Sequence, residues 1–112
     1  MADTIEIAQA SPVAYVTQVS GPGRGHSYDL SIDHIAIGRA EDNELVLPHE
    51  SVSRVHAFLD RKEDGRWAIS DNESKNGVLV NAEKINSLVL NNGDVFQIGN
   101  FGFQFFSGDR ND

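Results

Sequence analysis

Hydrophobic and polar residues alternate with a period of two along most of the chain, a pattern typical of β-strands. The first two stretches place the alternating residues on one face of a predicted hairpin: Val13, Tyr15, Thr17 and Val19, then Tyr28, Leu30 and Ile32. The segment 21–25, Gly-Pro-Gly-Arg-Gly, lies between them and is typical of a turn. A phosphate-cradling glycine loop is the alternative interpretation, but such loops open a helix, and no helical period follows.

Short alternating stretches continue to the end of the chain. They occupy 35–37, 45–47, 55–62, 67–71, 78–80, 88–90, 95–98 and 101–105. Glu63-Asp64-Gly65 and Asn81-Ala82 are predicted turns, and Asn91-Asn92-Gly93-Asp94 is a strong hairpin signal. About 10–11 short strands without a helical period predict an all-β fold, an antiparallel β-sandwich.

The same pattern predicts one domain. Residues 1–12 show no periodicity and end at Pro12, so we interpret them as a mobile N-terminal tail. The domain is expected to cover 13–108, and 109–112 form a C-terminal stub, after which an effector domain could have been removed. No apolar run reaches the roughly 18 residues of a membrane helix, and the acidic start, Met1 to Glu6, argues against a secretory signal.

Composition narrows the classes of function. The formal net charge is −8, which argues against nucleic-acid binding because phosphate backbones require a basic surface. The chain has no cysteine, so disulfides and thiolate chemistry are excluded, and we expect a cytoplasmic protein that does not contact membranes. Distant acids are screened within about 8–10 Å, so a small anion site remains possible where a few bases converge.

Three motifs place such bases at predicted strand ends. They are Gly38-Arg39, Ser53-Arg54-Val55-His56-Ala57 and Lys75-Asn76-Gly77, the last followed by Asn81. A phosphate carries about −1.5 to −2 charges and three acceptor oxygens, which guanidinium, hydroxyl and ammonium groups satisfy. An asparagine amide both donates and accepts, as binding to a peptide main chain requires. The motifs therefore favour an anion-binding site with no catalytic residue, cofactor or metal.

Two other chemistries were weighed. Ser53, His56 and Asp71 contain the groups of a hydrolase triad, but the predicted strand carries His56 away from the Ser53 loop. A serine-directed probe would detect such an enzyme. The four histidines lack the close spacing of a metal site.

In order and spacing, the three motifs resemble the forkhead-associated (FHA) family, phosphothreonine-binding modules built as a β-sandwich with the ligand held by loops at one end. The resemblance covers roughly 13–105. It implies that Arg39 and Ser53 bind the phosphate and that Asn76 binds the peptide main chain. Arg54, counted here among the phosphate-binding residues, is implied to contact the phosphate or the peptide. His56, Gly38, Gly77 and Asn81 are implied to support the site: His56 as a buried hydrogen-bonding residue, the glycines through backbone freedom and Asn81 as a turn cap.

One position departs from that pattern. Many family members have Thr or Ser before the asparagine of the third motif, where this chain has Lys75. The change removes a hydroxyl and adds a cation, so we count Lys75 among the phosphate-binding residues.

The resemblance predicts a non-enzymatic signalling module that binds phosphothreonine proteins downstream of a Ser/Thr kinase and regulates an attached output domain. A module that docks unphosphorylated partners is the alternative. Within the tail, Thr4 has acidic neighbours and Ile7 three residues later, so Thr4 is a candidate phosphosite for self-association. The kinase, the partner and the residue preferred at the third position after phosphothreonine are not predicted.

Overall fold

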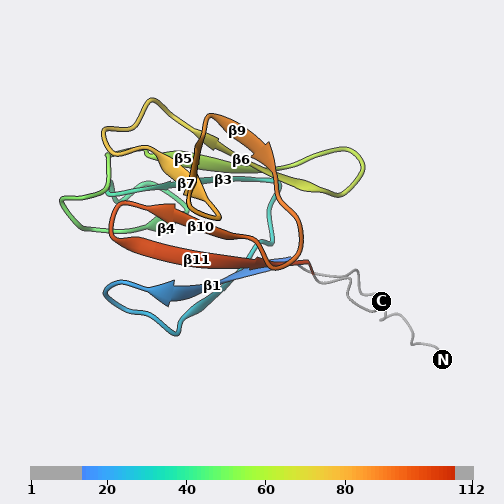
Figure 1. The fold of residues 1–112 in the computed structure, drawn as a ribbon, viewed down its shortest axis with the longest axis horizontal. Coiled ribbons are helices and arrows are strands. Elements are labelled where there is room, and N and C mark those ends of the chain that lie inside the picture. The colour runs from blue at the N-terminus through green and yellow to red at the C-terminus, as the bar shows by residue number, and fades with distance from the viewer. Residues whose placement is uncertain (1–13, 108–112) are drawn as a thin grey trace.

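The computed structural model describes residues 14–107, which form two β-sheets packed face to face (Figure 1). The eleven strands are β1 (Tyr15–Ser20), β2 (Ser27–Asp29), β3 (His34–Gly38), β4 (Leu45–Val46), β5 (Ala57–Arg61), β6 (Trp67–Asp71), β7 (Val78–Val80), β8 (Glu83–Ile85), β9 (Ser87–Val89), β10 (Val95–Ile98) and β11 (Phe101–Phe106). This confirms the predicted all-β sandwich. Among these residues no helix is long and apolar enough to cross a membrane.

Strand pairing divides the chain into a six-stranded sheet, β2-β1-β11-β10-β7-β8, and a five-stranded sheet, β4-β3-β5-β6-β9. The pairs are antiparallel except β3 and β4, which run parallel with Ile37 opposite Leu45. The predicted antiparallel sandwich thus includes one short parallel pair at this edge. After β3 the chain turns back along that strand as far as Glu44, whose carboxylate accepts a hydrogen bond from the Ala36 amide at 2.7 Å. From Glu44 the chain runs in the same direction as β3, so β4 pairs with β3 in parallel.

The core lies between the sheets and is built from large apolar side chains of both. Its fully buried members include Val16, Ile37, Leu59, Ile69, Phe96, Ile98 and Phe103. Burying each such side chain stabilises the fold by roughly 1.5–3 kcal/mol. Phe96 and Phe103 stack across the paired strands β10 and β11, with ring centroids 5.3 Å apart. This core fixes the strand ends from which the loops emerge.

The face of β1 that points inward carries a polar residue. Val16 and Gln18 point into the protein, while Val19 is 41% exposed. Gln18 is buried because its side-chain amide donates to the Pro22 carbonyl at 2.6 Å and to the Ser20 carbonyl at 3.2 Å, which closes the turn into β2. A buried polar group that finds such partners avoids the desolvation cost that would otherwise exclude it. Alternation alone could not identify this exception.

The segment Asn91-Asn92-Gly93-Asp94 forms a turn but not the predicted hairpin. Asp94 donates its amide to the Asn91 carbonyl at 3.0 Å. The flanking strands lie in different sheets, since β9 pairs with β6 while β10 pairs with β7 and β11. The turn therefore carries the chain from one sheet to the other. The short β8 was not predicted, because Glu83 and Lys84 are exposed at the sheet edge and give no apolar alternation.

Glu44 supplies a pH-dependent contribution to this fold. Hydrogen bonds from the Ala36 amide and from its own backbone amide, with a smaller effect from His34, lower the pKa of its carboxyl below the usual value. A lowered pKa stabilises the native state above the unfolded-state pKa, and this stabilisation is lost as the pH falls through the folded-state pKa. We expect Glu44→Gln to lower the melting temperature at pH 7 but not at pH 3. An equal decrease at both pH values would contradict this assignment.

Candidate functional site

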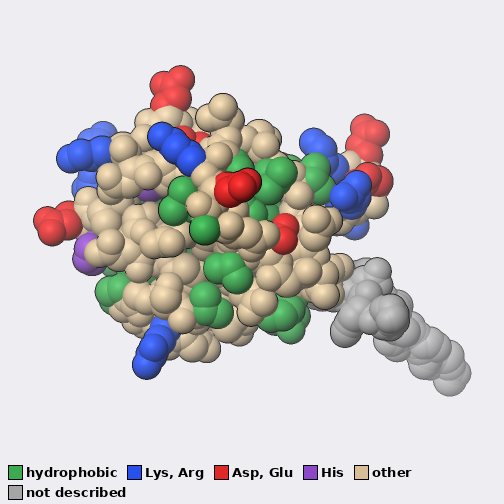
Figure 2. All heavy atoms as spheres, viewed as in Figure 1, with side chains coloured by type: hydrophobic (Ala, Val, Ile, Leu, Met, Phe, Trp, Pro, Cys, Tyr) green, Lys and Arg blue, Asp and Glu red, His purple; other side chains and the backbone are tan. Residues whose placement is uncertain are grey.

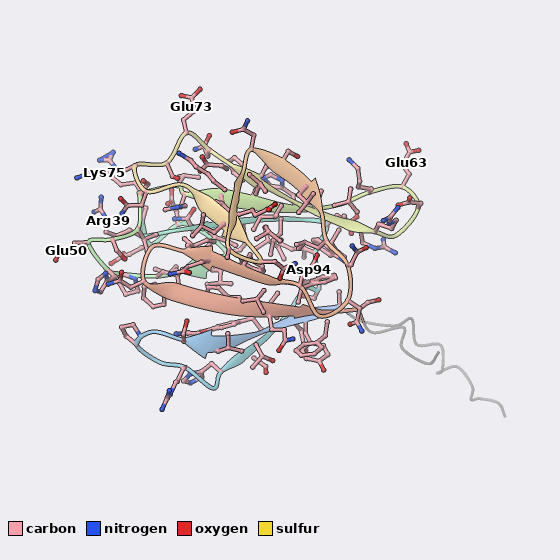
Figure 3. The ribbon with its side chains drawn as sticks, viewed as in Figure 1. Arg39, Glu50, Glu63, Glu73, Lys75 and Asp94 are labelled. Carbon is pink, nitrogen blue, oxygen red and sulfur yellow. The ribbon has the colours of Figure 1, made fainter. Side chains whose placement is uncertain are left out.

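Three loops meet at one end of the sandwich: the β3–β4 loop (39–44), the β4–β5 loop (47–56) and the β6–β7 loop (72–77). The Arg39 amide donates to the Ser53 carbonyl at 2.9 Å, which joins the first two loops. The Lys75 amide donates to the Ser53 hydroxyl oxygen at 3.0 Å, which joins the third. Figure 3 shows Arg39 and Lys75 at this end of the molecule. The fold thus brings together motifs that are far apart in the sequence.

Arg39 is exposed, and its guanidinium is anchored on one side. Its Nε donates to the Val52 carbonyl at 3.0 Å. The two terminal nitrogens keep their donors for a ligand, in the planar geometry that suits phosphate oxygens. This arrangement provides an oriented guanidinium for which little side-chain freedom is lost on binding.

Ser53 occupies the centre of the three loops. Its hydroxyl oxygen accepts the Lys75 amide, so the hydroxyl proton can point to an anion outside the loops. Its own amide donates to Nδ1 of His56 at 3.0 Å. Backbone bonds on both sides therefore fix where the Ser53 hydroxyl is presented.

His56 is fully buried behind this loop. Its Nδ1 accepts from the Ser53 amide, so Nε2 carries the proton of the neutral ring and donates to the Gly77 carbonyl at 2.8 Å. One imidazole thereby ties two of the binding loops together. The predicted strand 55–62 accordingly begins two residues late, at Ala57, because Val55 and His56 belong to the loop.

The same bonds show why these residues do not form a hydrolase triad. The acceptor nitrogen of His56 faces the Ser53 amide rather than its hydroxyl. Asp71 accepts from the Ser74 amide at 3.2 Å and so shapes the third loop. A triad requires the base against the nucleophile and the acid against the base.

Gly38 and Gly77 serve the loops for different reasons. A Cβ on Gly38 would lie 2.1 Å from the Arg54 carbonyl oxygen, so the β3 end and the β4–β5 loop can pack only with glycine there. Its backbone is not in the left-handed region, and the predicted need for backbone freedom at Gly38 is wrong. Gly77 has φ +81°, where a side chain is strained.

Arg54 extends its exposed side chain at this end, while its backbone is fixed from the β3–β4 loop. Its carbonyl accepts the Ala40 amide at 3.2 Å and the Asn43 side chain at 2.8 Å. Asn43 is 8% exposed, although it stands in a polar and acidic stretch of the sequence. Sequence reasoning missed Asn43 because a lone asparagine in an acidic stretch gives no signal of burial.

Asn76 is exposed beside Lys75, and its side-chain nitrogen donates to the Ser51 carbonyl at 2.9 Å. Ser51 was also missed. Its hydroxyl lies 2.9 Å from both the Asn100 amide and Nδ1 of His49, which links the β4–β5 loop to the β10–β11 turn. The amide oxygen of Asn76 remains to accept from a peptide backbone.

Asn81 lies outside this cluster, in the β7–β8 turn with φ +49°. Its side chain accepts the Val95 amide at 3.0 Å and donates to Asp94 at 2.9 Å. It therefore caps a turn and braces the start of β10. Thr4 and Ile7 lie outside the described residues.

The basic side chains of the site carry no internal counter-charge. Within residues 14–107, no carboxylate lies within 4 Å of a side-chain nitrogen of Arg39, Arg54 or Lys75, and the ion pairs are His34–Asp60 and Arg61–Asp33. The same residues contain no group of three His, Asp or Glu that could hold a metal ion. Figure 2 shows lysine and arginine side chains mainly toward the two ends of this view, while acidic side chains also lie near its middle. An acidic chain thus presents unpaired cations around an oriented hydroxyl.

Lys75 offers a test of how much an exposed cation contributes to phosphopeptide binding. Its amide is fixed by Ser53, but its side chain is exposed, so its attraction to a phosphate should be screened by salt. We expect Lys75→Thr to weaken phosphopeptide binding more at low salt than at high salt and to give a shallower salt dependence. Calorimetric titrations at several salt concentrations measure both slopes. Equal slopes would show that Lys75 does not act on the ligand.

Comparison with known proteins identifies the family of this chain. The FHA domain family matches residues 35–99. The glycogen accumulation regulator GarA of Mycolicibacterium smegmatis is 39% identical over 92 residues, 82% of this chain and 58% of that protein. This chain spans about three fifths of the length of the curated relatives it matches.

Two solved structures share the fold. EmbR of Mycobacterium tuberculosis, in complex with a low-affinity phosphopeptide, has 33% identity and a TM-score of 0.82 over 94% of this chain and 27% of that one. A structure from work on phosphothreonine-dependent FHA domain interactions has 26% identity and a TM-score of 0.75 over 84% of this chain and 95% of that one. The chain belongs to the FHA domain family.

Proposed function

We propose that this chain binds phosphothreonine segments of partner proteins and acts as a signalling module downstream of a Ser/Thr kinase. The observation that carries the proposal is the convergence of Arg39, Ser53 and Lys75, joined by backbone hydrogen bonds and without carboxylate partners in the described chain. A phosphate dianion supplies the charge and the acceptors that this arrangement lacks.

The surrounding groups suit a phosphate attached to a peptide. Asn76 lies directly after Lys75 and is held by Ser51, so its amide can bind a main chain that leaves the phosphate. Arg54 adds a second guanidinium from the adjacent loop. One of the two similar structures is a complex with a phosphopeptide, and the other comes from work on phosphothreonine-dependent interactions, which agrees with this ligand class. The module would then couple a kinase to an assembly or to an attached output domain.

Amide chemical shifts give a direct test. A phosphothreonine peptide added to the isotope-labelled chain should shift the amide signals of Arg39, Ser53, Lys75 and Asn76. The turn between β5 and β6, at the opposite end, supplies the internal control. Shifts confined to the sheet faces or to that turn would place the ligand elsewhere and contradict the proposed site.

We further propose that phosphorylated Thr4 is a ligand of the same site in a second molecule. Val13 lies nine positions after Thr4, so the connection spans at most about 30 Å. The described chain enters β1 at the end opposite Arg39 and Lys75 (Figures 1 and 3). Reaching its own site would require an almost fully extended connection, whereas binding between molecules would not.

Phosphorylation of Thr4 should therefore produce dimers or longer chains in analytical ultracentrifugation, since each molecule carries both a ligand and a site. Thr4→Ala should prevent this association, and Arg39→Ala should prevent it without removing the phosphate. A protein phosphorylated at Thr4 that remains monomeric and binds added phosphopeptide with full affinity would contradict the proposal.

A further inference from the structure

Lys84 brings another cation to the edge of the site, from a strand that carries none of the three motifs. It lies on β8, paired with Leu79 of β7. Its side chain runs back over Gly77: Cε lies 3.0 Å, and Nζ 3.7 Å, from the position that a Cβ on Gly77 would occupy. The absence of a side chain at Gly77 therefore leaves the space that the Lys84 stem fills.

Gly77 connects Lys84 to the binding loops. Its carbonyl accepts from the buried His56, and it lies two residues after Lys75, whose amide contacts the Ser53 hydroxyl. Two residues of chain span at most about 7 Å. The ammonium of Lys84 therefore lies next to the loop that carries Lys75 and Asn76.

The ammonium has no carboxylate partner. Lys84 is exposed, and within residues 14–107 no acidic side chain lies within 4 Å of its Nζ. An unpaired lysine is often a solvated surface group. Here its stem is packed against a glycine of the binding loop, so the charge is held at the border of the site.

We infer that Lys84 is a specificity-determining residue that selects a carboxylate side chain in the ligand, close to the phosphothreonine. This inference rests on the proposed function, because it assigns a subsite to the same bound peptide. Lys84 acts beside the phosphate site, so a phosphopeptide without the carboxylate side chain still binds.

Acidic residues at the same end of the molecule should limit the preference for a ligand carboxylate to one position. Glu50 lies at the same end of the molecule as Arg39, and Glu73 projects outward from the loop that carries Lys75 (Figure 3). A ligand carboxylate near either glutamate would be repelled, because like charges at short range oppose binding. A single favoured position, rather than a general preference for acidic peptides, is therefore expected.

The test uses the full 112-residue chain and a phosphothreonine peptide in an alanine background. Glutamate is placed in turn at each of about three positions on either side of the phosphothreonine. A second set of peptides carries lysine at the same positions, so that the charge is reversed. The proteins are wild type, Lys84→Met, which keeps the stem but removes the charge, and Lys84→Glu. Lys62→Met is the matched control, because Lys62 lies in the β5–β6 turn, next to Glu63 at the far end of the molecule (Figure 3).

At low salt, glutamate at one position should strengthen wild-type binding about two- to fivefold over alanine. Lys84→Met should remove that gain, Lys84→Glu should transfer it to the lysine peptide, and Lys62→Met should leave it unchanged. A glutamate preference that persists in Lys84→Met, or that is absent at every position, would overturn the inference. Binding of the all-alanine phosphopeptide in that case would leave the proposed function intact, and its failure to bind would overturn both.

Discussion

Arg39→Ala should abolish measurable binding of a phosphothreonine peptide while leaving the melting temperature nearly unchanged. A charge-assisted hydrogen bond contributes about 1.5–3 kcal/mol, and a paired contact from the two terminal nitrogens contributes more. Short peptides of this class are expected to bind near micromolar affinity, about −8 kcal/mol, so the loss weakens binding tenfold or more. Isothermal calorimetry measures the affinity, and a thermal melt measures the stability.

The matched control for Arg39 is Arg61→Ala. Arg61 is also an exposed arginine, but it lies at the end of β5 and is 3.6 Å from the Asp33 carboxylate. Its removal changes the net charge by the same amount without touching the proposed site. We expect Arg61→Ala to bind the peptide as the wild type does. Equal affinities for Arg39→Ala and wild type would contradict the assignment of the phosphate site.

His56→Ala should produce the largest loss of stability among the site variants. The substitution leaves the Ser53 amide and the Gly77 carbonyl without their partner in a buried position. An unsatisfied buried group costs about 1–3 kcal/mol. For a domain of this size, each kcal/mol lowers the melting temperature by roughly 4–8 °C. Thermal and denaturant unfolding both measure the effect.

Ser53→Ala separates architecture from ligand contact. It removes the hydroxyl that accepts the Lys75 amide at a half-buried position, but it keeps the backbone bonds to Arg39 and His56. We expect a clear loss of phosphopeptide affinity with little change in stability. If instead Ser53→Ala unfolded the domain and His56→Ala only weakened binding, the two assigned roles would be reversed.

The sequence predicted the fold class and the three loops because both depend on local signals. Period-two alternation marked most strands, and glycine or asparagine beside a basic or hydroxyl residue marked the loops that converge. The convergence itself followed only from the family resemblance. Backbone bonds such as Arg39 to Ser53 join residues far apart in sequence, and no local pattern encodes them.

The errors arose where tertiary contacts override alternation. Gln18 is buried because its side chain closes the turn that follows its own strand. The parallel β4 depends on Glu44 returning to Ala36. Asn43 and Lys84 became visible as parts of the site only through contacts with Arg54 and Gly77. In each case, a polar residue with an ordinary local context acts through a partner from another strand or loop.

The central claim is that this site recognises a phosphate on threonine, and one matched titration tests it most directly. The wild-type chain is titrated calorimetrically with a single peptide in three forms, containing phosphothreonine, phosphoserine or unmodified threonine. The account predicts near-micromolar binding of the phosphothreonine form, weaker binding of phosphoserine and no measurable binding of the unmodified peptide. Equal affinity for the modified and unmodified threonine peptides would contradict it.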